Sequence, residues 1–461
     1  MTADRSLTLT GARRTMINVI RVAYHTLGCK VNQYETEKIR ETLEEAGFAT
    51  VPFDSPADAY IVNTCSVTST ADAKSRAAVR RAVRANPDAF VVVAGCYAEL
   101  EPEVFRAIEG VDLVVPNAEK DAIAQRIVAR FAGAGHRRAE NEGLSDDGKR
   151  KPQSAKPGRP RLRTRAVVKV QDGCDQFCSY CIVPHARSVK WSRPIEEVLA
   201  EVRALAGFGY REIVLTGIRL GAYRSREREG RGLADLVGAV AEIDGVERVR
   251  LSSVEPWEVD DALLAAMQSP KVCRHLHIPL QSGDDGILAR MNRPYAAVEY
   301  REIVRRVRER IPGIGITTDV IVGFPGETED AFANTRDLIE ELGFSRLHVF
   351  RYSPRKGTAA ASMDDRISPE VKRRRAENLI ELGKNAMRRF AESMVGQTLD
   401  VLVERRAARS KRLIGFTDNY IEVSFAGDAA LAGRIVPVRI VGVDQDGGGG
   451  VLGFAHGFDQ D

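Results

Sequence analysis

Short apolar runs separated by amphipathic helical segments fill the first part of this chain, residues 18–131. The strand-like runs are 19–24, 59–63, 90–94 and 112–115. The helix-like segments are 35–46, 71–84, a segment that starts at residue 102, and 118–131. Apolar strands of this length between helices predict an α/β domain with a parallel sheet covered by helices on both faces.

A second series of alternating strands and helices occupies residues 166–394. Its predicted strands are 167–171, 212–216, 248–252, 276–280, 315–322 and 346–351. Amphipathic helices separate them, for example at 194–207, 233–243 and 298–311. Six such repeats predict a partial (βα)6 barrel, in which reactive groups lie at the carboxyl ends of the strands.

The pattern changes again over residues 395–458, after a long basic helix at 369–394. Short β-type runs follow at 398–404, 412–416, 420–425, 434–443 and 451–454. Five short strands in so few residues predict a small OB-like β-barrel. A basic loop lies beside two aromatic residues, Phe416 and Tyr420, and its members are Arg405, Arg406, Arg409, Lys411 and Arg412. Cations with a stacking surface favour RNA binding over a merely solvated positive face.

The remaining segments contain few apolar residues. Residues 132–165 are rich in Gly, Ser, Lys, Arg and Pro and predict a flexible linker. Residues 1–17 predict a disordered leader, and Met16 is an alternative start that N-terminal sequencing would identify. No hydrophobic stretch is long enough to span a membrane, and the leader lacks the apolar core of a signal peptide.

Cysteine usage changes this picture most. The chain has 461 residues, 44% of them hydrophobic, and a net charge of only +4. Seven cysteines in such a length do not indicate a disulfide scaffold. Six of them fall into two groups of three, which indicates metal ligands in a reducing, cytoplasmic compartment. Cys273 stands alone and is expected to be a buried core thiol.

Cys174, Cys178 and Cys181 have the spacing C-x3-C-x2-C after the first predicted barrel strand. Thiolates select soft metal centres, and a 4Fe–4S cluster takes one ligand for each iron. Three local ligands leave one iron open for a substrate or cofactor. The alternatives are a zinc site completed by His185, or three ordinary thiols.

Cys29, Cys65 and Cys96 each follow a predicted strand of the first domain. Carboxyl ends of parallel strands meet at one sheet edge, where ligands bind. These three cysteines therefore predict a second cluster, with three buried structural thiols as the alternative. In the barrel, glycine and polar residues recur after four further strands, at 216–223, 252–256, 279–283 and 318–327, and predict a pocket.

The spacing of Cys174, Cys178 and Cys181, with Tyr180 before the last of them, resembles the radical S-adenosylmethionine (SAM) superfamily. From about residue 19 to 454 the chain resembles the methylthiotransferase family, which has an N-terminal cluster domain, a radical-SAM barrel and a C-terminal TRAM domain. Residues 26–35 (TLGCKVNQYE), 171–174 (QDGC) and 352–358 (YSPRKGT) look like the branch that acts on N6-threonylcarbamoyladenosine beside the tRNA anticodon.

This resemblance implies two 4Fe–4S clusters and SAM as cofactors, and a 5′-deoxyadenosyl radical that removes hydrogen from C2 of the adenine at position 37. The second cluster would deliver sulfur, and a second SAM the methyl group. The residues expected to line the SAM pocket are Tyr180, Arg187, Glu255 and Gln281. The implied partners are a tRNA anticodon stem-loop, a flavodoxin- or ferredoxin-type electron donor and a sulfur donor.

Two residues depart from the family pattern near the expected site. Ser188 stands where the family usually has Gly, and Arg351 where Pro is common. Neither is an expected ligand. The alternative functions are modification of a ribosomal protein or of isopentenyladenosine in tRNA, and a non-catalytic iron–sulfur protein that binds RNA.

Overall fold

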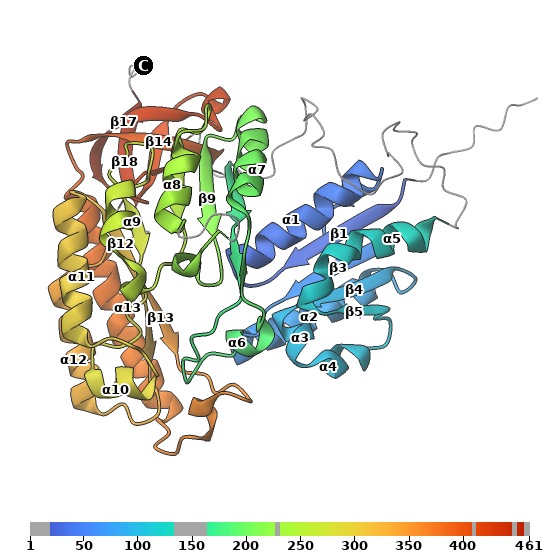
Figure 1. Ribbon diagram of the computed structural model, residues 1–461, viewed down its shortest axis with the longest axis horizontal. Coiled ribbons are helices and arrows are strands. Elements are labelled where there is room, and N and C mark those ends of the chain that lie inside the picture. Colours follow the sequence, from blue (N-terminus) through green and yellow to red (C-terminus); the bar gives the residue numbers. More distant parts are fainter. Residues whose placement is uncertain (1–18, 133–163, 226–230, 408–411, 445–449, 456–461) are drawn as a thin grey trace, which may run out of the picture. The chain divides into compact units, whose positions relative to one another are not determined.

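The computed structural model describes residues 19–132, 164–225, 231–407, 412–444 and 450–455 (Figure 1). The chain folds into two compact units. Of the described residues, the first contains 19–27, 35–64 and 74–132, and the second contains 28–34, 65–73 and those from 164 onward. The predicted leader, most of the predicted linker, Arg409 and Lys411 lie outside the described residues.

A five-stranded parallel sheet with the order β2-β1-β3-β4-β5 forms the first unit. The strands are β1 (Arg21–Thr26), β2 (Ala49–Val51), β3 (Ala59–Thr64), β4 (Phe90–Gly95) and β5 (Leu113–Val115). The helices of this region are α1 (Lys30–Glu45), α2 (Ser69–Ala85), α3 (Cys96–Leu100), α4 (Pro102–Arg106) and α5 (Ile123–Phe131), with the 3-10 helix η1 (Asn117–Ala122).

Alternate strand residues of this sheet pack into two separate cores. Val22 and Ile61 face the layer that contains Leu43 of α1. Ala23 and Tyr60 face the opposite layer, which is built from α2, α3 and α4. Side chains on successive strand residues point to opposite faces, so a strand that is apolar throughout must be covered on both sides. The predicted α/β layering is therefore confirmed.

Six parallel strands form the curved sheet of the second unit. They are β6 (Arg165–Lys169), β9 (Glu212–Thr216), β10 (Arg248–Leu251), β11 (His275–His277), β12 (Gly315–Val322) and β13 (Arg346–Arg351). The hydrogen-bonded orders are β10-β9-β6 and β11-β12-β13. Parallel bridges from Val249 to Val272 and from Ser253 to His277 join the two halves. This is the predicted partial barrel.

Helices follow these strands in sequence. They are α7 (Ile195–Gly207), α8 (Leu233–Ala241), α9 (Asp261–Ala266), α10 (Asp285–Arg290), α11 (Ala297–Arg310), α12 (Glu329–Leu342) and α13 (Pro369–Glu392), and the short elements β7 (Gln171–Asp172), α6 (Val183–Ala186) and β8 (Trp191–Ser192) lie between β6 and α7. Thr328 caps α12 by accepting a hydrogen bond from the amide of Ala331 at 3.1 Å, and Gly343 ends it in the left-handed region.

Several predicted boundaries were wrong, including two that lie beside expected site residues. Helix α1 begins at Lys30, not at residue 35, directly after Cys29. Strand β11 ends at His277, although the prediction extended it to residue 280. Pro279 has no backbone N–H, so the ladder loses a donor there.

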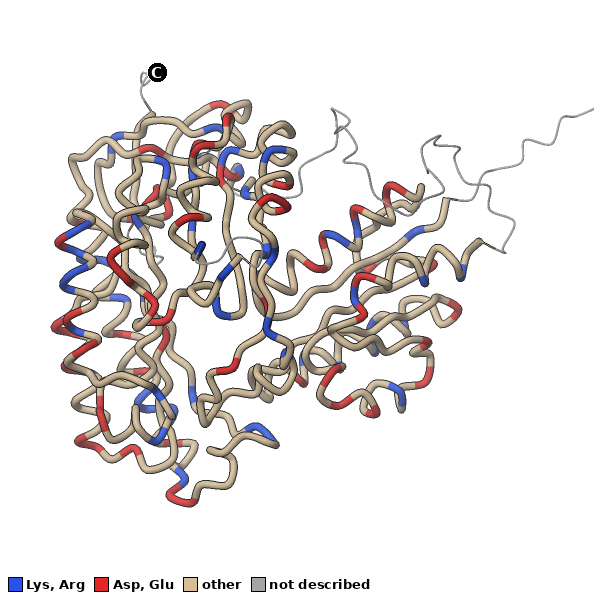
Figure 2. The backbone as a smooth tube through the Cα atoms, in the orientation of Figure 1, with Lys and Arg blue, Asp and Glu red and all other residues tan. Residues whose placement is uncertain are grey.

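Basic and acidic residues are interspersed along the helices (Figure 2). On α11, Arg305 pairs with Glu302 and Glu309, one turn away on either side. Such exposed pairs contribute little to stability. No helix among the described residues is both long and apolar enough to cross a membrane.

A closed β-barrel with the strand order β14-β15-β16-β18-β17 follows α13, as predicted. Its strands are β14 (Thr398–Arg406), β15 (Arg412–Thr417), β16 (Glu422–Ala426), β17 (Ile435–Val443) and β18 (Val451–Ala455). Its core contains Val401, Val423 and Phe425.

Arginine side chains lie beside two aromatic residues of this barrel, Phe416 and Tyr420. The guanidinium of Arg165 lies 5.1 Å from the ring centroid of Phe416 and 5.3 Å from that of Tyr420. Arg250 lies 4.7 Å from the Tyr420 ring. The Nε of Arg412 donates a hydrogen bond to the hydroxyl of Ser424 at 2.9 Å. Of the expected basic loop, Arg405 is exposed, and the two aromatic residues beside it, Phe416 and Tyr420, are half-buried.

A buried carboxylate, Glu212 at the start of β9, lies where the two barrels meet. It is fully buried and pairs with Arg250 at 2.6 Å and, more distantly, with Arg248 and Arg165. Arg250 also donates to the backbone carbonyl of Asp418 at 2.9 Å. Burial alone would raise the pKa of Glu212, but Arg250 and the other arginines outweigh it and lower that pKa.

Replacing Glu212 with Gln should lower the free energy of unfolding by about 3–5 kcal/mol, because the buried guanidinium of Arg250 would lose its carboxylate partner. Since the pKa of Glu212 is lowered in the folded protein, its contribution is present at neutral pH and is lost as the pH falls through that folded pKa. Urea unfolding of wild type and E212Q at several pH values measures both effects. The control is E302Q, which changes an exposed residue of α11 and should leave the urea midpoint unchanged. If E212Q had the same midpoint as E302Q, the stabilising role of Glu212 would be contradicted.

Candidate cluster-binding site

The loop between β7 and α6 carries Cys174, Cys178 and Cys181. All three thiols are free; Cys178 is buried and the other two are partly exposed. The loop follows β6, the first barrel strand, so the thiols lie at the carboxyl end of the parallel sheet, as predicted. Three free thiols on one loop have the soft donor chemistry that an iron–sulfur cluster requires.

Backbone hydrogen bonds hold this loop against the segment that follows α10. The amide of Ser179 donates to the carbonyl of Met291 at 3.0 Å. The side-chain amide of Asn292 donates to the carbonyl of Phe177 at 2.8 Å. On the other side, the amide of Ala360 donates to the carbonyl of Ser179 at 2.7 Å. The positions of the thiols are therefore set by two distant parts of the chain.

Gly173 permits the sharp turn that starts the loop. Its φ is +76°, in the left-handed region that favours glycine. A Cβ atom placed on Gly173 would lie 2.3 Å from the carbonyl oxygen of Val189. No residue with a side chain fits here without displacing the backbone at Val189.

Arg187 is held beneath the loop by other groups. Its Nη1 lies 2.8 Å and 2.9 Å from the two carboxylate oxygens of Asp172, and its Nη2 donates to Asn32 at 2.9 Å. Its carbonyl accepts from the amide of Cys174 at 3.3 Å. In this arrangement Arg187 supports the loop; its expected pairing with the SAM carboxylate stays a prediction.

Arg293 is a site residue that sequence reasoning missed. Its Nη1 lies 3.4 Å from the sulfur of Cys178, and its Nη2 pairs with Glu255, one of the residues expected to bind SAM. The guanidinium lies 4.9 Å from the ring centroid of Trp257 and 5.1 Å from that of Tyr295. The sequence signal that could have identified it is the Met-Asn-Arg-Pro segment directly after α10.

The other two expected SAM-pocket residues have distinct settings. Tyr180 packs on the apolar cluster that contains Met291 and Tyr352. Gln281 has φ of +63°, which is uncommon for a residue with a side chain. Its amide donates to the carbonyl of Asp319 at 2.8 Å, which fixes this conformation. Strained backbone of this kind clusters at functional sites.

Burial controls the protonation of the cysteines. Desolvation raises the pKa of Cys174, and it raises the pKa of Cys181 to about 12. At neutral pH these two side chains are therefore thiols when no metal is bound, and metal binding must displace their protons. Among the described residues, His185 belongs to no trio of His, Cys, Asp or Glu ligand atoms within 4.8 Å, so the arrangement does not favour the zinc alternative.

The first cysteine group lies at three neighbouring strand ends. Cys65 directly follows β3, Cys96 directly follows β4, and Cys29 follows β1 after a two-residue turn. Glycines let these turns approach one another: a Cβ on Gly28 would lie 2.9 Å from the sulfur of Cys65, and one on Gly95 would lie 2.3 Å from the carbonyl oxygen of Thr64. The three cysteines again have the donor chemistry of an iron–sulfur cluster.

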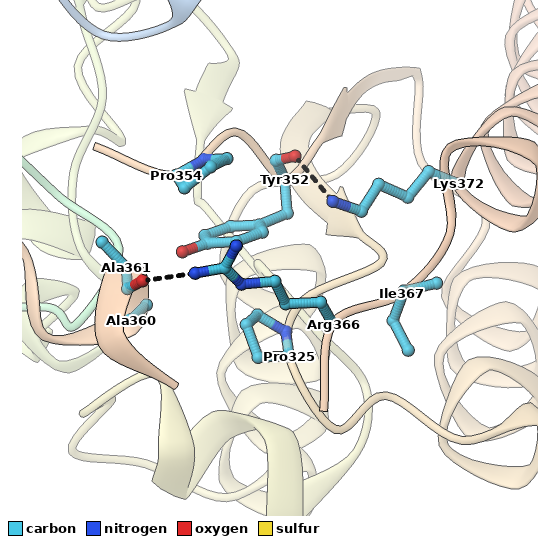
Figure 3. Close-up of a pocket in the computed structure, with 8 residues that line it drawn as sticks. All are labelled: Pro325, Tyr352, Pro354, Ala360, Ala361, Arg366, Ile367 and Lys372. Atoms are coloured by element: carbon cyan, nitrogen blue, oxygen red, sulfur yellow. Dashed lines mark hydrogen bonds between the residues drawn. The ribbon is translucent and has the colours of Figure 1, made fainter. Parts of the chain in front are cut away.

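A small pocket lies beside the 352–358 motif (Figure 3). The side chain of Arg366 extends along the ring of Tyr352 and donates to the carbonyl of Ala361 at 3.3 Å. Lys372 donates to the carbonyl of Tyr352 at 3.3 Å. Burial raises the pKa of Tyr352, whose hydroxyl has no hydrogen-bond partner among the described residues.

Replacing Gly173 with Ala should displace the cysteine loop and reduce its iron and sulfide content, because the left-handed backbone alone costs about 1–3 kcal/mol for a residue with a side chain. Chemical analysis of iron and sulfide after anaerobic reconstitution measures this. The control is G238A: Gly238 lies inside α8 with nothing within 4 Å of an added Cβ, so this change should leave iron unaltered and stabilise the fold by about 0.5–1 kcal/mol. Equal iron content in both variants would disprove the role of Gly173.

Replacing Arg293 with Lys should leave the cluster in place but make its midpoint potential more negative, because hydrogen bonds to ligand sulfurs help set that potential. Lysine keeps the positive charge that compensates Glu255. Because it lacks the planar guanidinium of arginine, it cannot donate to Glu255 and to the sulfur of Cys178 at the same time. Redox titration monitored by electron paramagnetic resonance measures the potential. R301K, which changes an exposed arginine of α11 paired with Glu341, is the control. A potential unchanged in R293K would show that the contact with Cys178 has no electronic effect.

Comparison with protein families agrees with the layout of the chain. Residues 21–116 match a model described as "Uncharacterized protein family UPF0004", residues 168–339 match the radical SAM superfamily, and residues 392–445 match the TRAM domain. Among solved structures, the radical S-adenosylmethionine methyltransferase TsrM from Kitasatospora setae is similar in fold. It has a TM-score of 0.52 and 17% identity, over 74% of this chain and 77% of TsrM.

Curated relatives match over nearly the whole chain. The threonylcarbamoyladenosine tRNA methylthiotransferase MtaB of Bacillus subtilis (strain 168) is 40% identical, over 91% of this chain and 93% of the relative. The MtaB protein of Thermotoga maritima is 36% identical, over 92% and 95%. The tRNA-2-methylthio-N(6)-dimethylallyladenosine synthase of Geobacter metallireducens is 37% identical, over 90% and 94%. With this identity and coverage, and a radical-SAM domain flanked by UPF0004 and TRAM domains, the chain belongs to the tRNA methylthiotransferase family of radical-SAM proteins.

Proposed function

We propose that this protein adds a methylthio group to C2 of N6-threonylcarbamoyladenosine at position 37 of tRNA. The observation that carries the proposal is the similarity over nine-tenths of the chain to MtaB proteins, at 40% and 36% identity, combined with three free thiols at the carboxyl end of β6. The similarity indicates the reaction class of the relatives. The three thiols are this chain's own donors for an iron–sulfur cluster.

Cys174, Cys178 and Cys181 would hold one 4Fe–4S cluster, and Cys29, Cys65 and Cys96 a second. When bound, the first cluster supplies the reductive cleavage of SAM, and the second supplies sulfur. The protein's own groups then bind and orient. Tyr180, Arg187, Glu255 and Gln281 remain our proposed SAM-pocket residues.

Arg293 connects the cysteine loop of residues 174–181 with the proposed SAM pocket. It pairs with Glu255 and donates toward Cys178 at 3.4 Å, so it is a positioning residue between a cysteine ligand and the proposed SAM pocket. The rings of Trp257 and Tyr295 pack against its guanidinium. This packing excludes water from one side of the site, where a reactive radical must be kept from side reactions.

The tRNA itself is the proposed macromolecular partner, with the C-terminal β-barrel as part of its binding surface. A flavodoxin- or ferredoxin-type reductant and a separate sulfur source are the other proposed partners, and we place the activity in the cytoplasm. The dimethylallyladenosine synthases are a specific second candidate, because one of them is 37% identical to this chain. Both candidates share the chemistry and differ in the group on N6.

Mass spectrometry of nucleosides tests the function. The chain is expressed in a bacterial host that lacks its own methylthiotransferases and contains both N6-threonylcarbamoyladenosine and the dimethylallyl nucleoside. We expect 2-methylthio-N6-threonylcarbamoyladenosine to appear and the dimethylallyl nucleoside to stay unchanged.

The inactive control is C178A, which removes one cluster ligand, and the matched folding control is G238A. Methylthiolation of the dimethylallyl nucleoside instead would establish the second candidate. Unchanged nucleosides, in cells where the protein carries its full iron content, would disprove both.

A further inference from the structure

Three side chains on neighbouring strands of the large barrel form a cluster that the proposed reaction does not use. They are His277 on β11, Asp319 on β12 and His348 on β13. One ligand atom from each lies within 4.8 Å of the others. We propose that these residues form a binding site for a divalent first-row transition-metal ion.

The strand register places the trio on one face of the sheet. Asp319 is paired directly with His348 across β12 and β13. His277 is paired with Thr317, which lies two residues before Asp319 on the same strand. Because alternate residues of a strand point to the same face, all three side chains must project together. Regular hydrogen-bonded strands hold them, so the cluster does not depend on loop conformation.

The donor set determines which ligand fits. Two imidazoles and one carboxylate are the ligands of many zinc, iron and other transition-metal sites that keep further coordination positions open. The Nε2 atom of His277 lies 3.2 Å from a carboxylate oxygen of Asp319, so both already point to a common centre. An anion would meet the negative charge of Asp319, whereas a cation meets three electron-pair donors.

A hydrogen bond behind the trio orients one of its imidazoles. The hydroxyl of Thr317 lies 2.9 Å from Nδ1 of His277 and 3.2 Å from Nε2 of the buried His275. If Nδ1 of His277 donates to this hydroxyl, the lone pair of Nε2 is left facing Asp319. Metal-binding histidines usually have such a partner on the second nitrogen, which fixes the tautomer and the ring orientation.

The accessibility of the trio also suits an ion that must enter and leave. The His277 side chain is 17% exposed and that of Asp319 is 29% exposed. The site shares no residue with the six cluster cysteines or with the proposed SAM pocket. The inference therefore does not rest on the proposed function.

Zinc is the probe for this site, and the full-length protein is used with both clusters reconstituted anaerobically, so that the cysteines are occupied. The protein is equilibrated with Zn²⁺, freed of loose ions by gel filtration, and analysed for zinc, iron and sulfide. We expect about one zinc for each chain, and at least ten-fold weaker zinc binding in D319N and in H348Q. H25Q changes a histidine of β1 that packs on Phe53 and should bind zinc like the wild type.

X-ray absorption at the zinc edge identifies the ligands. Nitrogen and oxygen neighbours at about 2.0–2.1 Å support the site, whereas sulfur neighbours at about 2.3 Å would show that zinc had entered a cysteine site and would overturn the proposal. Zinc binding by D319N and H348Q equal to that of wild type would also overturn it, as would a wild-type protein that retains no zinc. Iron content and thermal unfolding of each variant establish that it is folded.

Discussion

The buried carboxylate of Glu212 is the interaction on which the second unit depends. A carboxylate without solvent exposure is tolerable only when cations and hydrogen bonds compensate for its lost hydration. Arg250 provides this compensation and then uses its remaining donors on backbone carbonyls of the C-terminal barrel, at Asp418 and Thr417. One negative charge thereby orients an arginine that connects two folded barrels.

The cysteine loop is organised differently, mainly through backbone hydrogen bonds and one glycine. The cation beside Cys178 is Arg293, which is neutralised by Glu255 and covered by aromatic rings. An arginine held in this way can donate to a sulfur ligand without requiring movement of the loop. Charge at this site is therefore fixed by packing, in contrast to the exposed pairs along α11.

Much of this architecture could be predicted from the sequence, because apolar periodicity and cysteine spacing are local signals. The strands β9, β12 and β13 were predicted to the residue, and Cys273 is the buried thiol that was expected. Arg293 could not be predicted, since its importance arises from a contact with Cys178 more than a hundred positions away. The arginines beside the Tyr420 ring could not be predicted either, since Arg165 and Arg250 come from distant strands.

The packing of helix α13 limits how the C-terminal barrel could be exchanged between proteins during evolution. The TRAM match begins at residue 392, where this helix ends, yet the helix packs against β13, and its Gly383 allows close contact with Leu347. Arg375 of the same helix is buried in a pair with Glu327. An ancestral exchange of the terminal module would therefore have needed to keep α13 with the recipient and supply new carbonyl partners for the arginines around Glu212. The border of the TRAM match therefore does not coincide with a border in the packing of the chain.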